Sequence, residues 1–182
     1  MTMMKTWPKF LDEKENQQHE FSSTQINLPK AITSEILAFS REHIPDSFLY
    51  SKEGREDEIH VTVLYGLRDE SPDQIKEILE QERPVKFKLG RISAFDNNEE
   101  YDVIKVEVIS PDLHRLHKSL KALPHHDKHP RYQPHVTIAY VKKGKGKRII
   151  GNGAFDGEIV KSDKVTFVSF NNEKTEIELK KG

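Results

Sequence analysis

Cysteine is absent from this 182-residue chain. Its absence excludes thiol nucleophiles, disulfide frameworks and thiolate metal sites. The sequence has no apolar run long enough for a signal peptide or a membrane span, so a cytoplasmic protein without a membrane partner is expected. Neither sign of charge prevails, because 29 Lys and Arg residues stand against 30 Asp and Glu residues. A protein that holds long DNA or RNA through a broad positive field is therefore not expected.

One domain accounts for the length of the chain, since compact domains usually hold about 100–200 residues. Hydrophobic residues make up 35% of the sequence and charged residues 32%, which predicts a modest core under a polar surface. Residues 1–22 carry few apolar anchors, and we expect them to form a flexible N-terminal tail. Residues 23–182 are expected to form the single domain.

Alternating apolar residues predict strands, and apolar residues at helical spacing predict helices between them. Strands are expected at residues 23–28, 59–65, 85–95, 101–109, 135–141, 164–170 and 175–180. Three main helices are expected, between Pro29 and Pro45, around residues 75–79 and from Ser110 to Pro124. Helices that separate groups of strands in this way predict an α+β fold with a largely antiparallel sheet or two small sheets.

One tetrapeptide pattern occurs twice: histidine, apolar residue, threonine, apolar residue. The copies are HVTV and HVTI, which begin 75 residues apart, and each lies in a run that predicts a strand. Alternate side chains of a strand lie on one face, so His60 shares a face with Thr62, and His135 with Thr137. Because the chain has only nine histidines, a chance repeat of this pattern is improbable.

Two imidazoles and two hydroxyls suit the chemistry of a phosphate diester. A hydroxyl donates to a phosphate oxygen, and an imidazole, with an ordinary pKa of about 6.5, binds or releases a proton near neutral pH. One histidine can take the proton of the attacking oxygen while the other protonates the leaving oxygen. This chemistry requires no metal and no cofactor, and none is expected. A single copy would favour a structural histidine bonded to a backbone carbonyl, but two copies favour catalysis.

The paired motifs resemble those of the 2H phosphoesterase superfamily, which includes RNA 2′,3′-cyclic phosphodiesterases and the 2′-5′ RNA ligases. The resemblance covers residues 23–179. It implies a bilobal α+β fold in which two pseudo-symmetric halves, with antiparallel sheets, form a central cleft. It also implies metal-independent catalysis with His60, Thr62, His135 and Thr137 as the four motif residues.

A narrower resemblance points to the substrate. The stretches SPDLHRLHKSL and RYQPHVTIAYV are similar to the phage anti-CBASS nucleases, which destroy the cyclic oligonucleotide alarm signals of infected bacteria. This likeness implies a cyclic di- or trinucleotide cleaved at a 3′–5′ linkage, in the cytoplasm of a bacterial host. The adjacent 2′-hydroxyl would attack the phosphorus and leave a 2′,3′-cyclic phosphate end.

Two other functions remain open at this point. The same chemistry can act on the 2′,3′-cyclic phosphate end of a short RNA, although the near-neutral charge disfavours long RNA. A protein of another class, a non-catalytic nucleotide sensor, would bind the phosphate without turnover. The order of the two histidines as base and acid is also open.

Four further residues are candidates for contact with the substrate. Lys142 and Lys143 begin a basic segment directly after the second motif strand, where they can attract a polyanion. Phe95 ends a strand and can stack on a base or fill the core. Tyr132 lies in the loop before His135 and can form part of a lid or fix the entry of the loop into the strand.

Two tyrosines and a group of histidines have simpler interpretations. Tyr65 and Tyr140 follow the two motifs at the same offset, but strand parity places them on the face opposite the histidines, in the core, unless a bulge intervenes. Two more histidines, 114 and 117, lie one helical turn apart before a loop with three others, at a spacing that can bind zinc. A polar helix face is the favoured interpretation, since no metal-binding signature is present.

Overall fold

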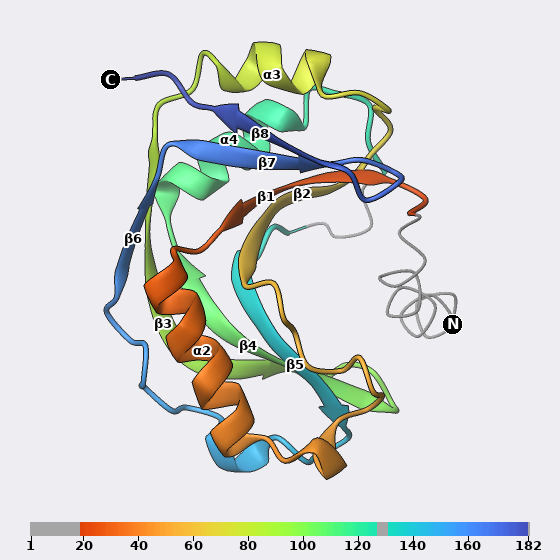
Figure 1. Cartoon of the computed structure of the whole chain (residues 1–182), viewed down its shortest axis with the longest axis vertical. Helices are drawn as coiled ribbons and strands as arrows, with labels where there is room; N and C mark the ends of the chain where they lie inside the picture. Colours follow the sequence, from red (N-terminus) through yellow and green to blue (C-terminus); the bar gives the residue numbers. More distant parts are fainter. Residues whose placement is uncertain (1–18, 127–130, 182) are drawn as a thin grey trace.

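The computed structural model describes residues 19–126 and 131–181. Over these residues eight strands form one antiparallel sheet in the order β6-β3-β4-β5-β2-β1-β7-β8 (Figure 1). The strands are β1 (Ser22–Asn27), β2 (His60–Leu67), β3 (Val85–Phe95), β4 (Tyr101–Ile109), β5 (His135–Lys142), β6 (Ile159–Ser162), β7 (Lys164–Val168) and β8 (Lys174–Glu178). The helices are α2 (Lys30–His43), α3 (Asp73–Leu79) and α4 (Pro111–Leu120), with short 3-10 turns η1 (Asp46–Phe48) and η2 (Lys147–Ile149). The expected α+β class is confirmed.

The sheet consists of two four-stranded halves that meet at a narrow seam. β2 and β5 pair through a single register position, Val61 opposite Val136. One half is β5-β4-β3-β6 and the other is β2-β1-β7-β8, each read outward from the seam. Figure 1 shows the sheet strongly curled, with β1, β2, β7 and β8 at the top and β5 running below them. The expected halves are therefore present, joined in one continuous sheet rather than two.

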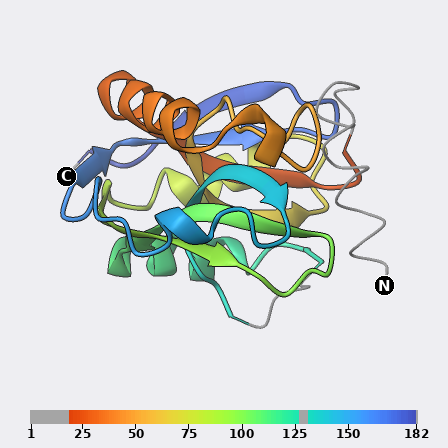
Figure 2. The ribbon, with the colours of Figure 1, turned by 90° about the horizontal axis from the view of Figure 1, so that it is seen from below.

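The three helices pack against this curled sheet. Helix α4 begins at the predicted position. Ser110 Oγ accepts a hydrogen bond from the Leu113 amide at 3.0 Å, and Pro111 takes the first helical position. Figure 2 shows α2 and α4 on opposite sides of the curled strands. Apolar residues of all three helices join one core cluster with Val61 and Val136 of the seam. The opposite face, which carries His60 and His135, is called the site face below.

The start of the folded part and one strand differ from the predictions. Residues 19–22 were expected in the flexible tail, but Phe21 is buried and the His19 amide donates to the Phe170 carbonyl at 2.6 Å. The folded part thus includes His19; residues 1–18 lie outside the described residues. Strand β6 was not predicted, because it follows a glycine-rich stretch and has only four residues, yet it pairs with the edge of β3. None of the helices in the described ranges has the length and apolar content to cross a bilayer.

Candidate active site

Both motifs lie at the seam, at the start of their strands. Because β2 and β5 run antiparallel with Val61 opposite Val136, the register places His60 opposite Thr137 and Thr62 opposite His135. Side chains directly opposite in such a pair have their Cβ atoms about 4.5–5.5 Å apart. All four of these side chains are half-buried on the site face. The structure therefore brings the four predicted catalytic residues together as one group.

The two histidines are held in the same way. His60 Nδ1 lies 2.9 Å from the carbonyl oxygen of Glu58, and His135 Nδ1 lies 2.7 Å from that of Gln133, in each case two residues earlier. A carbonyl only accepts, so each Nδ1 carries the hydrogen and each Nε2 is left to bind or release a proton. The backbone before each motif thus selects the tautomer that an acid–base pair requires.

The environment of His135 favours its neutral form. Burial lowers the pKa of His135, and the positive charges of Lys105 and His60 act in the same direction. The hydrogen bond to the Gln133 carbonyl and the charge of Glu107 act against this shift without reversing it. A neutral His135 at neutral pH is suited to accept a proton.

The threonine hydroxyls complete the group. Within the described part of the chain, neither Thr62 nor Thr137 uses its side-chain oxygen in a hydrogen bond. Their neighbours Val61 and Val136 are fully buried on the other face, so the strands are fixed while the hydroxyls remain accessible. The arrangement can donate two hydrogen bonds to a phosphate placed between the histidines.

A bulge in each motif strand corrects the prediction for the two tyrosines. In β2 the pairing register with β1 shifts between Thr62 and Tyr65, so both residues oppose β1 residues on one face of that strand. In β5 the pairing register with β4 shifts between Thr137 and Tyr140, with the same effect. The extra residue in each bulge reverses, for the residues that follow it in the strand, which face of the sheet each side chain lies on. Both tyrosines therefore lie on the site face, not in the core beneath the helices.

The two tyrosines have different surroundings. Tyr65 is 42% exposed and meets Phe21 edge-on, with ring centroids 5.9 Å apart. Tyr140 is 5% exposed and packs with Tyr101 and Val103 in a small cluster separate from the main core. Tyr65 thus offers aromatic surface to a ligand on the site face, whereas Tyr140 supports the sheet.

Phe95 lies beside His135 of the motif group. Its ring meets the His135 ring edge-on, with centroids 4.9 Å apart and an interplanar angle of 88°. Lys105 Nζ lies over the same ring, 4.4 Å from its centroid. One face of Phe95 is therefore covered by an ammonium, and the contact that the structure supports is with His135 rather than with a base.

Tyr132 makes structural contacts with β2 and with His117. Its hydroxyl donates to the Thr62 carbonyl at 2.8 Å, and its ring stacks on His117 with centroids 4.1 Å apart. His117 Nδ1 in turn lies 2.7 Å from the Val63 carbonyl oxygen. These contacts tie the loop before β5 to the backbone of β2, so Tyr132 fixes the entry of the loop into the strand.

We expect Tyr132→Phe to lower the free energy of unfolding by about 1–2 kcal/mol, because the partly buried Thr62 carbonyl loses its donor. Urea denaturation measures the loss. Tyr50→Phe is the matched control, since its hydroxyl donates to Glu100 at an exposed position and should matter less. Equal losses in the two variants would contradict this role of Tyr132.

The basic segment lies away from the histidines. Lys142 ends β5, seven residues after His135 and up to about 23 Å along the strand. Its ammonium donates to the Ser47 carbonyl at 3.1 Å, and that of Lys143 lies 2.9 Å from Asp102 Oδ1. The structure therefore does not bring these two lysines to the group of two histidines and two threonines at the seam.

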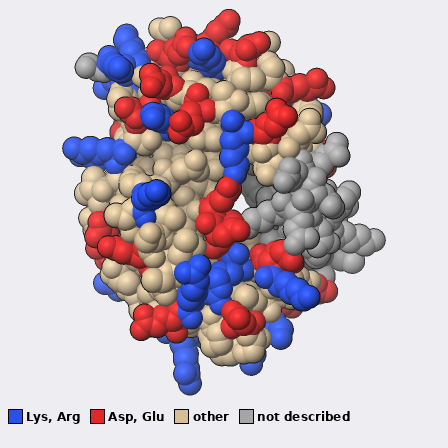
Figure 3. All heavy atoms as spheres, viewed as in Figure 1, with Lys and Arg blue, Asp and Glu red and all other residues tan. Residues whose placement is uncertain are grey.

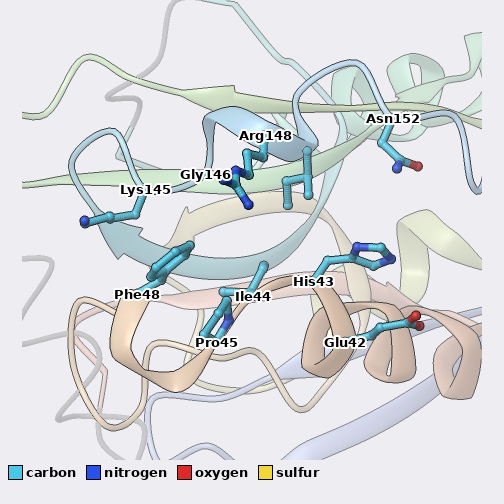
Figure 4. A pocket seen from close by; sticks show the side chains of 10 residues that line it. Glu42, His43, Ile44, Pro45, Phe48, Lys145, Gly146, Arg148 and Asn152 are labelled. Carbon is cyan, nitrogen blue, oxygen red and sulfur yellow. The ribbon is translucent and has the colours of Figure 1, made fainter.

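Lys145 and Arg148 of the basic segment line a separate pocket. Figure 4 shows Lys145 and Arg148 across from His43 and Phe48, between the end of α2 and the loop after β5. Lys145 Nζ lies 5.5 Å from the centroid of the Phe48 ring. This pocket shares no residue with the motif group.

The possible zinc ligands are dispersed. His117 is engaged by Tyr132 and the Val63 carbonyl, and His114 meets the edge of the same tyrosine ring. Among the described residues no three histidine, aspartate or glutamate side chains are grouped as a metal site requires. His129, the last member of the loop cluster, lies outside the described residues.

The sequence prediction missed two charged residues of the site. Lys105 and Glu107 lie on β4 directly opposite Thr137 and His135. Strand alternation alone places them on one face of β4, but only the pairing with β5 shows which face that is. No motif in the sequence marks them.

The comparisons with known proteins agree with this fold. TT0787 of Thermus thermophilus has a TM-score of 0.66 at 16% identity, over 88% of this chain and 98% of its own. E. coli LigT, in a complex with NADP+, has a TM-score of 0.60 at 17% identity, over 90% and 95%. Usb1 of Kluyveromyces marxianus, with uridine monophosphate, has a TM-score of 0.54 at 12% identity, over 88% and 98%. A search among curated proteins finds no match.

The family follows from a match to the sequence itself. The model of the 2′-5′ RNA ligase superfamily matches residues 31–150, which is well over half of the chain. That range includes both His-x-Thr motifs and the seam that joins them. The chain therefore belongs to the 2′-5′ RNA ligase superfamily, the family of 2H phosphoesterases.

Proposed function

We propose that the protein is a metal-independent phosphodiesterase that acts on a phosphodiester with a neighbouring 2′-hydroxyl. The observation that carries this proposal is the group of two histidines and two threonines at the β2–β5 seam, with both Nδ1 atoms bound to carbonyls. Such a group provides a proton acceptor, a proton donor and two hydrogen-bond donors for the phosphate without any further component.

The reaction follows from these positions. His135 Nε2 takes the proton of the 2′-hydroxyl, and the 2′-oxygen attacks the phosphorus. The bond from phosphorus to the 5′-oxygen breaks, and that oxygen takes a proton from the imidazolium of His60. Thr62 and Thr137 donate to the non-bridging oxygens, where charge accumulates. The products are a 2′,3′-cyclic phosphate and a 5′-hydroxyl, and water can open the cyclic phosphate in a second step.

A cyclic di- or trinucleotide is the substrate that we favour. On the side of the molecule seen in Figure 3, basic and acidic side chains are intermixed, so no broad positive surface is available there for a long nucleic acid. Tyr65, exposed on the site face, offers a surface on which a base can stack. A compact ligand needs only these local contacts.

The cyclic phosphate end of an RNA is the second candidate substrate, because the family match supports it equally. The structures of LigT were solved with NADP+ and with 3′-AMP, and that of Usb1 with uridine monophosphate. These ligands of similar folds support a nucleotide for this chain but do not select between a ring and an end.

A substrate panel in excess EDTA separates the alternatives. The panel contains cyclic di- and trinucleotides, an RNA with a 2′,3′-cyclic phosphate end and a linear RNA, and products are followed by chromatography. We expect cleavage of the cyclic oligonucleotides with a 2′,3′-cyclic phosphate as the first product. His60→Ala serves as the inactive reference.

Each other outcome changes the proposal. Cleavage of the RNA end alone selects the second substrate. Tight binding of a nucleotide without products indicates a sensor in place of an enzyme. Activity that vanishes in EDTA and returns with a divalent cation rejects the metal-independent mechanism.

A further inference from the structure

A buried ammonium lies beside the catalytic group. Lys105 is 4% exposed, and its Nζ lies 2.7 Å from Ser93 Oγ and 3.0 Å from Glu107 Oε1. The Ser93 hydroxyl also donates to Glu107 Oε1 at 2.9 Å. Because an unpaired charge is costly in the interior, these contacts hold the ammonium in one place.

Phe95 connects this ammonium to His135. Its ring contacts both groups: Lys105 Nζ lies over the ring, and the imidazole and the ring meet edge to face. The face of an aromatic ring attracts a cation, so Lys105 favours one orientation of Phe95. The His135 imidazole therefore has two contacts that fix it, the Phe95 ring and the Gln133 carbonyl.

The other half of the sheet has no charge at the equivalent positions. Lys105 opposes Thr137 and Glu107 opposes His135. The residues opposite Thr62 and His60 carry no charge.

Gln25 opposes Thr62, and Asn27 opposes His60. Gln25 Nε2 donates to Asn27 Oδ1 at 2.7 Å, and Asn27 Nδ2 donates to Thr166 Oγ1 at 3.3 Å. The two halves are thus equivalent in backbone pairing and unequal in charge.

We propose that Lys105 and Glu107 are positioning residues that act through His135 and prepare it, rather than His60, to accept the proton. This inference rests on the proposed function for its catalytic consequence, but its electrostatic part concerns the protein alone. Lys105 holds the imidazole through Phe95 and opposes its protonation, while Glu107 limits that effect. Removal of either charge therefore moves the titration of His135 in a defined direction.

The ionisable groups that act on His135 within the described residues are Lys105 and Glu107 from β4 and His60 from β2. From β3 it meets only the uncharged ring of Phe95. Burial raises the pKa of Glu107, but its hydrogen bonds with Lys105 and Ser93 outweigh burial and lower it. Glu107 is therefore ionised at neutral pH, and its charge opposes that of Lys105 at His135.

NMR titration of the histidine C2 protons tests this directly and needs no substrate. The His135 signal is assigned by its loss in His135→Ala. In the wild type we expect its midpoint to lie below that of an ordinary histidine, which is about 6.5. Lys105→Met should raise the midpoint and Glu107→Gln should lower it, each by about one pH unit. The double variant should return close to the wild-type midpoint.

The rate profile provides the catalytic readout. As the pH rises, His135 loses its proton and becomes competent to accept one, so the acidic limb of kcat/KM should follow its midpoint. Lys105→Met should move this limb to higher pH and Glu107→Gln to lower pH. A purely structural role would lower the rate equally at every pH and leave the titration unmoved, and that result overturns the proposal.

Gln25→Met is the matched control from the other half, because it removes a polar side chain from the position equivalent to Lys105 without changing the charge. It should leave the His135 midpoint in place. Shifts in the same direction for Lys105→Met and Glu107→Gln would also overturn the proposal. Glu107 is the milder test, since its side chain is 46% exposed and the variant is expected to fold. If the titrations move as expected and no panel substrate is cleaved, the proposed function fails while the electrostatic part stands.

Discussion

His60→Ala and His135→Ala should each lower kcat/KM by on the order of 10²–10⁴. In the proposed reaction each removes one of the two Nε2 atoms that transfer a proton, so the transfer must pass through water instead. Steady-state rates on the substrate identified by the panel measure the loss. Since both residues act in one transition state, the double variant should lose little more than the worse single variant.

The control for these variants is His43→Ala, an exposed histidine on α2 that lies outside the motif group. It should retain the wild-type rate. Circular dichroism of all variants checks the fold. A variant at His60 or His135 that folds and keeps wild-type turnover removes that histidine from the chemistry.

Thr62→Val and Thr137→Val should each lower kcat by roughly 10²–10³, the loss typical of one hydrogen-bond donor to a developing oxyanion. Valine has nearly the shape of threonine and lacks the hydroxyl, so the strand should be preserved while the donor is removed. Serine at either position restores the donor and should recover most of the rate. Single-turnover kinetics separate this step from product release.

Thr175→Val provides the matched control, because Thr175 is exposed on β8 and remote from the seam in strand order. Its rate should be unchanged. If the valine variants at 62 and 137 raised KM and left kcat intact, the hydroxyls would hold the substrate equally in the ground and transition states, and their proposed role would be wrong.

Local pattern was sufficient to predict most of the secondary structure. The strands that carry the motifs, the hairpin of β7 and β8 and the three helices all follow from alternation, helical spacing and turn residues. Asn172, in the turn between β7 and β8, adopts a positive φ of 63°, as asparagine readily does. Strand β6 was missed because four residues are too few to show a period.

Two features of strands separate the structure from the sequence-based expectations at the site. Tyr65 and Tyr140 were assigned to the wrong face because a bulge changes parity, and a bulge is visible only in the pairing of two strands. Lys142 and Lys143 follow the motif in sequence, but an extended strand carries them away from it. Nearness in the chain is therefore a poor guide to nearness on a sheet.

The amino-acid sequence by itself determined the proposed chemistry, because two copies of His-x-Thr in predicted strands can provide an acid–base pair with phosphate donors. Only the tertiary structure decided that the two copies meet at one seam and that β4 places Lys105 and Glu107 beside just one of them. The physical reason is that side-chain identity is local, whereas register and bulges arise from hydrogen bonds between segments far apart in the chain.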